Sequence, residues 1–110
     1  TTSSSIRYKQ DVQDIGDTSS NLYKLRPVSF KYNPEFHTGD EIQFGLIAEA
    51  VDKVFKDLVI YKNNQPETIK YNFLDPLLLN EIQKLHNKLQ NIKTEYNSLK
   101  EKIAGKQIIK

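Results

Sequence analysis

The chain has 110 residues, of which 37% are hydrophobic and none is cysteine. The absence of cysteine excludes disulfides and thiolate zinc sites, and a net charge of +2 is too small to indicate nucleic-acid binding. No apolar run approaches about 18 residues and no signal-peptide pattern opens the chain, so we expect neither a membrane span nor a leader. A chain with this apolar content often completes its core against a partner subunit.

Two short elements are predicted in the first third of the chain. The segment GDTSSNLYKL, residues 16–25, predicts a short helix with Asp17 or Thr18 as its cap. The segment RPVSFKYNP, residues 26–34, alternates apolar and polar side chains and therefore predicts a strand with one buried face. A turn or loop, EFHTGDE, follows it.

The middle of the chain predicts a helix and a hairpin. Residues 44–58 change to a 3.6-residue period, which predicts an amphipathic helix. Its inward side chains are Ile47, Val51, Val54, Phe55 and Leu58. Residues 58–71 predict two short strands around an Asn63-Asn64 turn, and Pro66 is expected to delay the second strand. The fold class is therefore α+β, a small mixed domain of short strands and an amphipathic helix.

The last third of the chain predicts a long helix with a heptad repeat. Asp75-Pro76 is a typical helix start, and Gly105 is expected to end the helix. Apolar residues recur at alternating steps of four and three, at Leu78, Ile82, Leu85, Leu89, Ile92, Tyr96, Leu99 and Ile103. This stripe would extend about 40 Å at ~1.5 Å per residue, more than a domain formed by the preceding residues could cover. We therefore favour pairing between chains over packing on the chain's own domain.

The composition of the stripe favours a parallel homotrimer. Isoleucine and leucine are mixed at both a and d positions, and the bulky Tyr96 occupies an a position, which suits a trimer better than a dimer. In a parallel assembly each g residue pairs with the following e residue. Glu95 with Lys100 attracts, whereas Lys88 with Lys93 repels. Residues 75–110 carry seven basic and four acidic side chains, which is also compatible with a solvated helix face.

Few residues offer catalytic chemistry. His37 and His86 suit neither a triad nor a metal site, which leaves a serine with a lysine. Ser4 and Lys9 are five residues apart, which places them ~140° apart on a helix and on opposite faces of a strand. They can meet only across a turn or between chains, and on spacing alone both are most simply linker residues. Arg7 would favour the neutral lysine that a general base requires.

Four segments occurring in one order resemble a known family. They are SSIRYKQDV (residues 4–12), LRPVSFKY (25–32), FGLIAEAVDKVFKDLV (44–59) and YNFLDPLLLNEIQKL (71–85). Together they resemble the self-cleaving intramolecular chaperone domain of phage tailspike, tail-fibre and neck-appendage proteins, which is also found in myelin regulatory factor transcription factors. The resemblance covers roughly residues 3–90.

This resemblance implies specific roles near the start of the chain. The family motif Ser-Asp-x-Arg-x-Lys falls on Ser4, Arg7 and Lys9, and Ser5 stands where the family has aspartate. Ser4 would attack the carbonyl of Ser3, Lys9 would take its proton, and the bond from Ser3 to Ser4 would break, with Arg7 in a supporting role. Ser3 and Ser5 are alternative nucleophiles, although the spacing to Lys9 favours Ser4.

The resemblance further implies a complete assignment of the chain. Residues 1–74 would form a chaperone and autocleavage domain, 75–104 a coiled-coil helix and 105–110 a tail. We expect a homotrimer that aids folding of an upstream fibre of the same polypeptide and then releases itself as a single-turnover Ser/Lys endopeptidase, without metal or cofactor. It would act in the host cytoplasm during virion assembly, be released from the mature appendage, and have no nucleic-acid or membrane partner. The alternative is a non-catalytic trimerisation or capping module.

Overall fold

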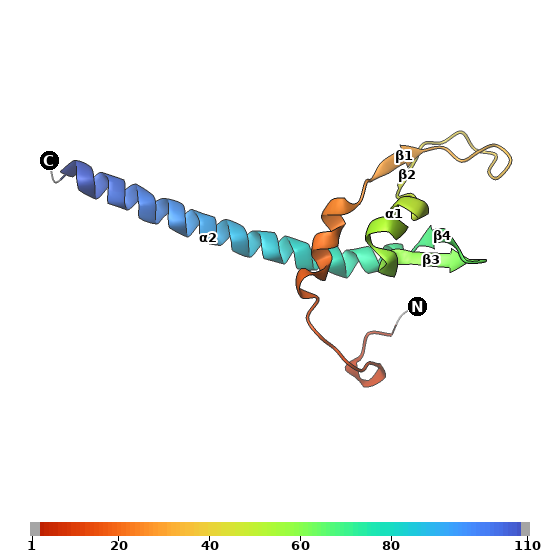
Figure 1. The fold of residues 1–110 in the computed structure, drawn as a ribbon, viewed down its shortest axis with the longest axis horizontal. Coiled ribbons are helices and arrows are strands. Elements are labelled where there is room, and N and C mark those ends of the chain that lie inside the picture. Colours follow the sequence, from red (N-terminus) through yellow and green to blue (C-terminus); the bar gives the residue numbers. More distant parts are fainter. Residues whose placement is uncertain (1–2, 109–110) are drawn as a thin grey trace.

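One helix determines the shape of the molecule (Figure 1). The computed structural model describes residues 3–108, and its helix α2, Leu74–Ile108, contains 35 residues. The molecule measures 76 × 42 × 24 Å, with a radius of gyration of 21.9 Å. A compact chain of this length would have a radius of about 13 Å, so α2 extends far beyond the rest of the protein. The predicted α+β class is confirmed.

A small head precedes α2 and packs against its first turns. We call residues 16–73 the head. It contains two short antiparallel hairpins, one short α-helix and three 3₁₀ helices: η2 (Gly16–Lys24), β1 (Val28–Phe30), β2 (Gln43–Gly45), α1 (Ala48–Val54), η3 (Lys56–Leu58), β3 (Val59–Lys62), β4 (Gln65–Ile69) and η4 (Tyr71–Phe73). A further 3₁₀ turn, η1 (Ile6–Tyr8), lies outside the head.

The second hairpin matches its prediction closely. β3 and β4 pair antiparallel, and the connecting Asn63 and Asn64 both have positive φ, 52° and 61°. Asparagine tolerates this left-handed conformation, which two-residue hairpin turns require. The expected delay at Pro66 is wrong, because β4 begins at Gln65 and Pro66 pairs with Tyr61 beside a register irregularity. Such irregularities are positions where a strand accepts proline.

The hydrophobic core lies where α1, η3 and the β3–β4 hairpin meet the start of α2. Its buried residues are Val51, Phe55, Leu58, Val59, Ile69 and Leu77. The helix predicted over 44–58 is shorter than expected, because α1 covers only Ala48–Val54 and Leu58 belongs to η3. Residues 43–45 form strand β2 instead, paired with β1 from Val28↔Gly45 to Phe30↔Gln43.

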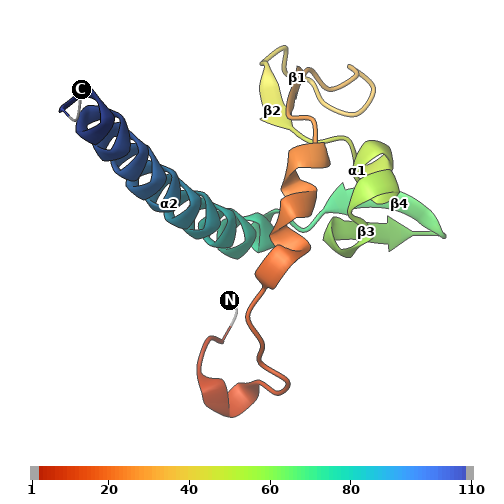
Figure 2. The same ribbon diagram turned by 60° about the vertical axis from the view of Figure 1, so that its left-hand side comes forward.

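Helix η2 crosses α2 and connects the head to it (Figures 1 and 2). The predicted helix is present, but it is a 3₁₀ helix. Its N-cap is Ile15, which makes no side-chain capping bond, so the predicted cap at Asp17 or Thr18 is wrong. Leu22 and Leu25 are partly buried and pack against the core.

The long helix begins as predicted but continues further. α2 starts at Leu74, one residue before the expected Asp75, with Pro76 in its first turn. The predicted end at Gly105 is wrong, because the helix continues to Ile108. Of the predicted tail, residues 109–110 lie outside the described residues, as do residues 1–2 of the predicted N-terminal domain. None of the described helices combines the length and the apolar character needed to cross a membrane.

Candidate functional site

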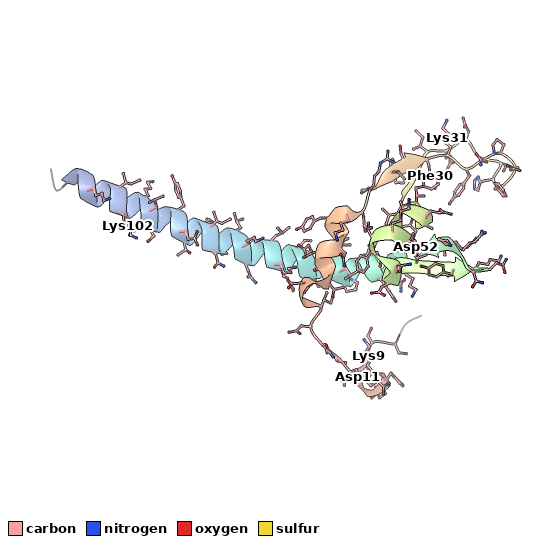
Figure 3. The ribbon with its side chains drawn as sticks, viewed as in Figure 1. Lys9, Asp11, Phe30, Lys31, Asp52 and Lys102 are labelled. Carbon is pink, nitrogen blue, oxygen red and sulfur yellow. The ribbon has the colours of Figure 1, made fainter. Side chains whose placement is uncertain are left out.

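The predicted cleavage residues lie on an extended segment outside the head. We call residues 3–14 the N-terminal arm; Figure 3 shows Lys9 and Asp11 on it, apart from the head. Within residues 3–108, no hydrogen bond or ion pair joins the arm to the rest of the chain. Its apolar side chains are accordingly exposed: Ile6, Tyr8 and Val12.

Ser5 shapes the arm by capping η1. Its side-chain oxygen accepts from the Arg7 backbone N–H at 3.4 Å and from the Arg7 guanidinium at 3.2 Å. The guanidinium also donates to the Tyr8 hydroxyl at 2.9 Å and lies 4.5 Å from the centre of that ring. A serine accepts these bonds as an aspartate would at an N-cap position. Ser5 therefore supplies a cap at the position where the family motif has aspartate.

Ser4 and Lys9 flank this capped turn. Ser4 precedes the cap, and Lys9 closes the turn by donating its backbone N–H to the Ile6 carbonyl at 3.1 Å. The structure thus has a turn between them, in place of the helix or strand whose geometry would separate the two side chains. No hydrogen bond joins the Ser4 and Lys9 side chains among the described residues, and both residues are exposed. A single chain positions the two residues near one turn without forming the dyad.

The heptad stripe of α2 is exposed along its whole length. Its eight side chains retain between 47% and 62% of their accessible surface: Leu78, Ile82, Leu85, Leu89, Ile92, Tyr96, Leu99 and Ile103. The head packs beside the first turns of this stripe, where η2 contacts α2 through Asn80, Glu81 and Lys84. An apolar stripe this long is a typical surface for association with other helices.

A buried polar cluster joins η2 to α2. Ser19 is fully buried and donates its hydroxyl to Glu81 at 2.7 Å, and Asn80 donates to Ser19 at 2.8 Å. Lys84 forms ion pairs with Glu81 at 3.1 Å and with Asp17 at 3.6 Å. A buried carboxylate is tolerated where its lone pairs are satisfied in this way. These contacts hold η2 in its position across α2.

The cluster holds Glu81 in its ionised form. The hydrogen bond from the Tyr23 hydroxyl lowers the pKa of Glu81 from 4.5 to about 2, with Ser19 and Lys84 acting in the same direction. The same hydrogen bond raises the pKa of Tyr23 above 10.0. Sequence reasoning missed this group, because its members resemble ordinary surface residues until η2 is placed across α2.

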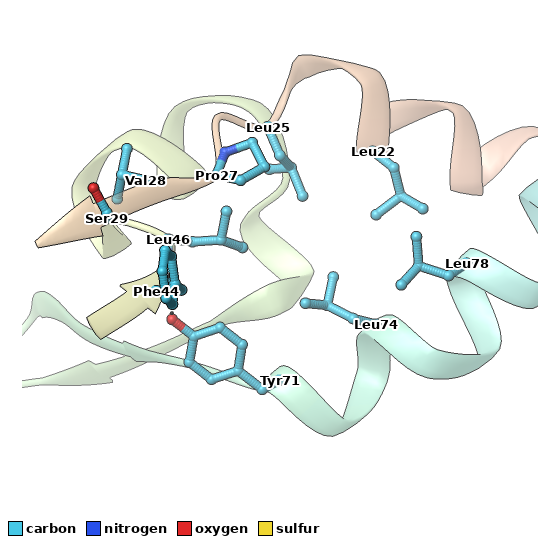
Figure 4. Close-up of a pocket in the computed structure, with 11 residues that line it drawn as sticks. Leu22, Leu25, Pro27, Val28, Ser29, Phe44, Leu46, Tyr71, Leu74 and Leu78 are labelled. Carbon is cyan, nitrogen blue, oxygen red and sulfur yellow. Dashed lines mark hydrogen bonds between the residues drawn. The ribbon is translucent and has the colours of Figure 1, made fainter. Parts of the chain in front are cut away.

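An apolar groove opens between η2, the β1–β2 hairpin and the start of α2 (Figure 4). We call it the head groove; its volume is about 550 Å³. Its main side chains are Leu22, Leu25, Phe44, Leu46, Leu74 and Leu78. Phe44 retains 82% of its accessible surface, so no other side chain of the described chain fills the groove. Apolar surfaces of this size are usually packed against another group.

One wall of the head groove depends on Gly45. The Leu46 backbone N–H donates to the Tyr71 hydroxyl at 3.0 Å, which fastens β2 to η4. A Cβ at Gly45 would lie 2.7 Å from that hydroxyl oxygen and 3.4 Å from the Phe30 ring. Only glycine allows so close an approach, which gives a structural reason for the glycine in the FGLIA segment.

The comparisons with known proteins place the chain in a family. The family model described as chaperone of endosialidase matches residues 4–60, which include the arm from Ser4 onward, both strands of the first hairpin, and α1. A search of curated proteins found no match. The chain belongs to the chaperone of endosialidase family, and this membership supports a chaperone role in the folding of a phage tail protein.

Proposed function

We propose that this chain trimerises through α2, assists the folding of an upstream phage fibre or tailspike, and then releases itself by cutting between Ser3 and Ser4. The observation that carries the proposal is the exposed heptad stripe, which leaves apolar surface along the full length of α2. Holding three chains together raises the effective concentration of the upstream segments. Assembly of long-range β-structure is slow, so this increase favours correct pairing.

In the proposed cleavage, Ser4 is the nucleophile and Lys9 the general base. The Ser4 hydroxyl attacks the carbonyl carbon of Ser3 while a neutral Lys9 accepts its proton. The bond between the Ser3 carbonyl and the Ser4 nitrogen breaks, the nitrogen takes up the proton, and an ester links Ser3 to the Ser4 oxygen. Water then hydrolyses the ester and frees the upstream chain.

The arm geometry supports this assignment of roles. Ser5 and Arg7 hold the turn that separates Ser4 from Lys9, so Arg7 positions the dyad as well as placing positive charge near Lys9. Since Ser4 and Lys9 are not bonded to each other in one described chain, the active arrangement forms only when the arm docks in the trimer. Cleavage would then follow assembly.

The test is expression of the chain behind a carrier protein, followed by a denaturing gel. We expect two fragments for the wild type and one intact band for Ser4→Ala and for Lys9→Ala. Ser3→Ala is the matched control, because it keeps the scissile carbonyl and should still be cut. Mass spectrometry of the smaller fragment should give a new amino terminus at Ser4; a terminus at Ser3 or Ser5 would assign the nucleophile to that serine.

The alternative is a non-catalytic trimerisation or capping module. It is favoured by one observation, that Ser4 and Lys9 are exposed and share no hydrogen bond in the described chain. An uncut wild type that sediments as a trimer would select this alternative, and a monomer would contradict both functions. In either case we place the protein in the host cytoplasm during virion assembly, with the fibre as its partner and with no membrane or nucleic-acid ligand.

A further inference from the structure

The head groove is continuous with the heptad stripe of α2. Leu78, which lines the groove, is also the first d position of the stripe, and Leu74, another lining residue, is the preceding g position. Figure 4 shows both side chains directed into the groove, on the side of it opposite η2. In a parallel bundle the g and d side of each helix faces a neighbouring helix. The groove therefore opens toward the neighbour in the proposed trimer.

The e positions of α2 carry one apolar exception. In chain order they are Leu79, His86, Lys93 and Lys100. Leu79 retains 56% of its surface in the single chain. Flanking e positions are usually polar, because they remain partly in water. Leu79 therefore has the character of a residue that is covered in the assembly.

Heptad arithmetic brings these two features together. In a parallel assembly, a g residue lies beside the e residue five positions later in the neighbouring helix. Leu74 is thus paired with the neighbour's Leu79, by the same rule that pairs Glu95 with Lys100. We propose that the head groove is a docking site for a second copy of this chain, whose Leu79 enters it beside Leu74. This inference rests on the proposed trimerisation.

The proposed contact closes the trimer and fixes its register. Each subunit has the groove on the g and d side of α2 and Leu79 on the e side, so three identical contacts complete a ring. If one helix slipped by a heptad, His86 would replace Leu79 in the groove. A polar imidazole without a partner in an apolar groove is unfavourable, so this slip is selected against. The groove thus specifies the register of the three α2 helices in addition to burying apolar surface between them.

Cysteine cross-linking of the full chain tests the contact, since the chain has no natural cysteine. Leu74→Cys and Leu79→Cys are combined in one chain, oxidised, and run on a non-reducing denaturing gel. The two positions are five residues apart and ~140° apart on one helix, so they cannot bond within a chain. We expect most of the protein to migrate as covalent dimer and trimer.

Two matched pairs separate this inference from trimerisation itself. Glu95→Cys with Lys100→Cys has the same g-to-e relation in the middle of α2 and reports the parallel bundle alone. Leu74→Cys with Gln83→Cys places the second cysteine at an exposed b position, away from the groove. We expect cross-linking from the first of these pairs and none from the second.

The outcomes distinguish the two proposals. Cross-linking at 95 and 100 without cross-linking at 74 and 79 leaves the trimer intact and overturns the groove contact. Failure of both pairs, with a monomer in sedimentation, overturns trimerisation and the groove contact with it. Equal yield from the pair at 74 and 83 contradicts the contact, since the linkage would then be unspecific. A further chain with Leu74→Cys and Val12→Cys tests the N-terminal arm as occupant of the groove. Preferential linkage of this pair would assign the groove to the arm and would overturn the proposed contact with Leu79.

Discussion

Replacing Gly45 with alanine tests how the head groove is built. Gly45 lies in β2, where the added Cβ would meet the Tyr71 hydroxyl oxygen at 2.7 Å and the Phe30 ring at 3.4 Å. The first distance is too short for any real contact, so Tyr71 must move. Its movement would break the hydrogen bond that the Leu46 N–H donates to the hydroxyl. The substitution should therefore destabilise the head through one identified atom.

The size of the effect follows from three contributions. Overpacking at a tight contact costs ~1–3 kcal/mol. Loss of the hydrogen bond adds ~0.5–1.5 kcal/mol, at the low end because Tyr71 is about half exposed. Alanine restricts the unfolded chain and offsets ~0.4–1 kcal/mol of this. We expect Gly45→Ala to lower the free energy of unfolding by about 2 kcal/mol.

A double-mutant cycle with Tyr71→Phe isolates the cause. Phenylalanine removes the hydroxyl that the new Cβ would meet, while the next ring atom is at an ordinary 3.7 Å. Gly45→Ala should therefore cost less than ~0.5 kcal/mol in the Tyr71→Phe background, a coupling above ~1 kcal/mol. Urea denaturation monitored by circular dichroism measures all four proteins, at one fixed chain concentration because association would shift the midpoint.

The result that would refute this reasoning is additivity. If Gly45→Ala costs the same in both backgrounds, the hydroxyl is not what excludes a side chain at position 45. A stabilised Gly45→Ala protein would also contradict the close approach of β2 to η4, since only the entropic contribution of alanine would then remain.

Three further predictions concern the core, the buried cluster and the arm. Leu58→Ala should lower the free energy of unfolding by ~2–5 kcal/mol in urea denaturation, because Leu58 is fully buried; an unchanged midpoint would contradict the described core. The pKa of Glu81 is lower in the folded chain, about 2 against 4.5, so its stabilising contribution is present above pH 4.5 and is lost as the pH falls toward 2. Stability measured from pH 6 to 2 should decline less for Glu81→Gln than for the wild type, and parallel curves would exclude this role. In a time course of the proposed self-cleavage, Ser5→Ala should slow cutting about fivefold, because it removes a cap worth ~1 kcal/mol. Ser5→Asp keeps a capping oxygen and should be cut at the wild-type rate. Equal rates for the wild type and both variants would exclude a role of the cap in cleavage.

The sequence predicted the elements whose local chemistry is sufficient by itself. Asn63 and Asn64 accept positive φ at low cost, so the β3–β4 hairpin could be placed from the turn alone. The heptad repeat predicted α2 from local sequence as well, because an apolar stripe with this period and length indicates a helix. Gly105 was over-interpreted, because one glycine costs a helix only ~1 kcal/mol and need not end it.

Elements that depend on distant contacts could not be predicted in this way. Strand β2 has only three residues, and its one large apolar side chain, Phe44, lies on the exposed side, so the sequence does not mark it as a strand. Its pairing with β1 defines it. The Ser19–Glu81 bond joins residues 62 positions apart, and nothing in either segment indicates burial. At the candidate cleavage site, motif similarity assigned Ser4 and Lys9, and the structure adds the Ser5 cap between them.

The separation of the N-terminal arm from the head affects whether a cut there can be reversed. Ile15 packs against the core and Asn80 donates to the Gly16 carbonyl at 3.0 Å, so the chain is anchored from that point onward. Nothing in the described part of the chain holds the two sides of the Ser3–Ser4 bond next to each other. After hydrolysis, the new carboxyl and amino ends would diffuse apart, and their effective concentration would fall to that of free molecules. Religation would then be negligible, while the head and α2 would keep every contact that they had before the cut.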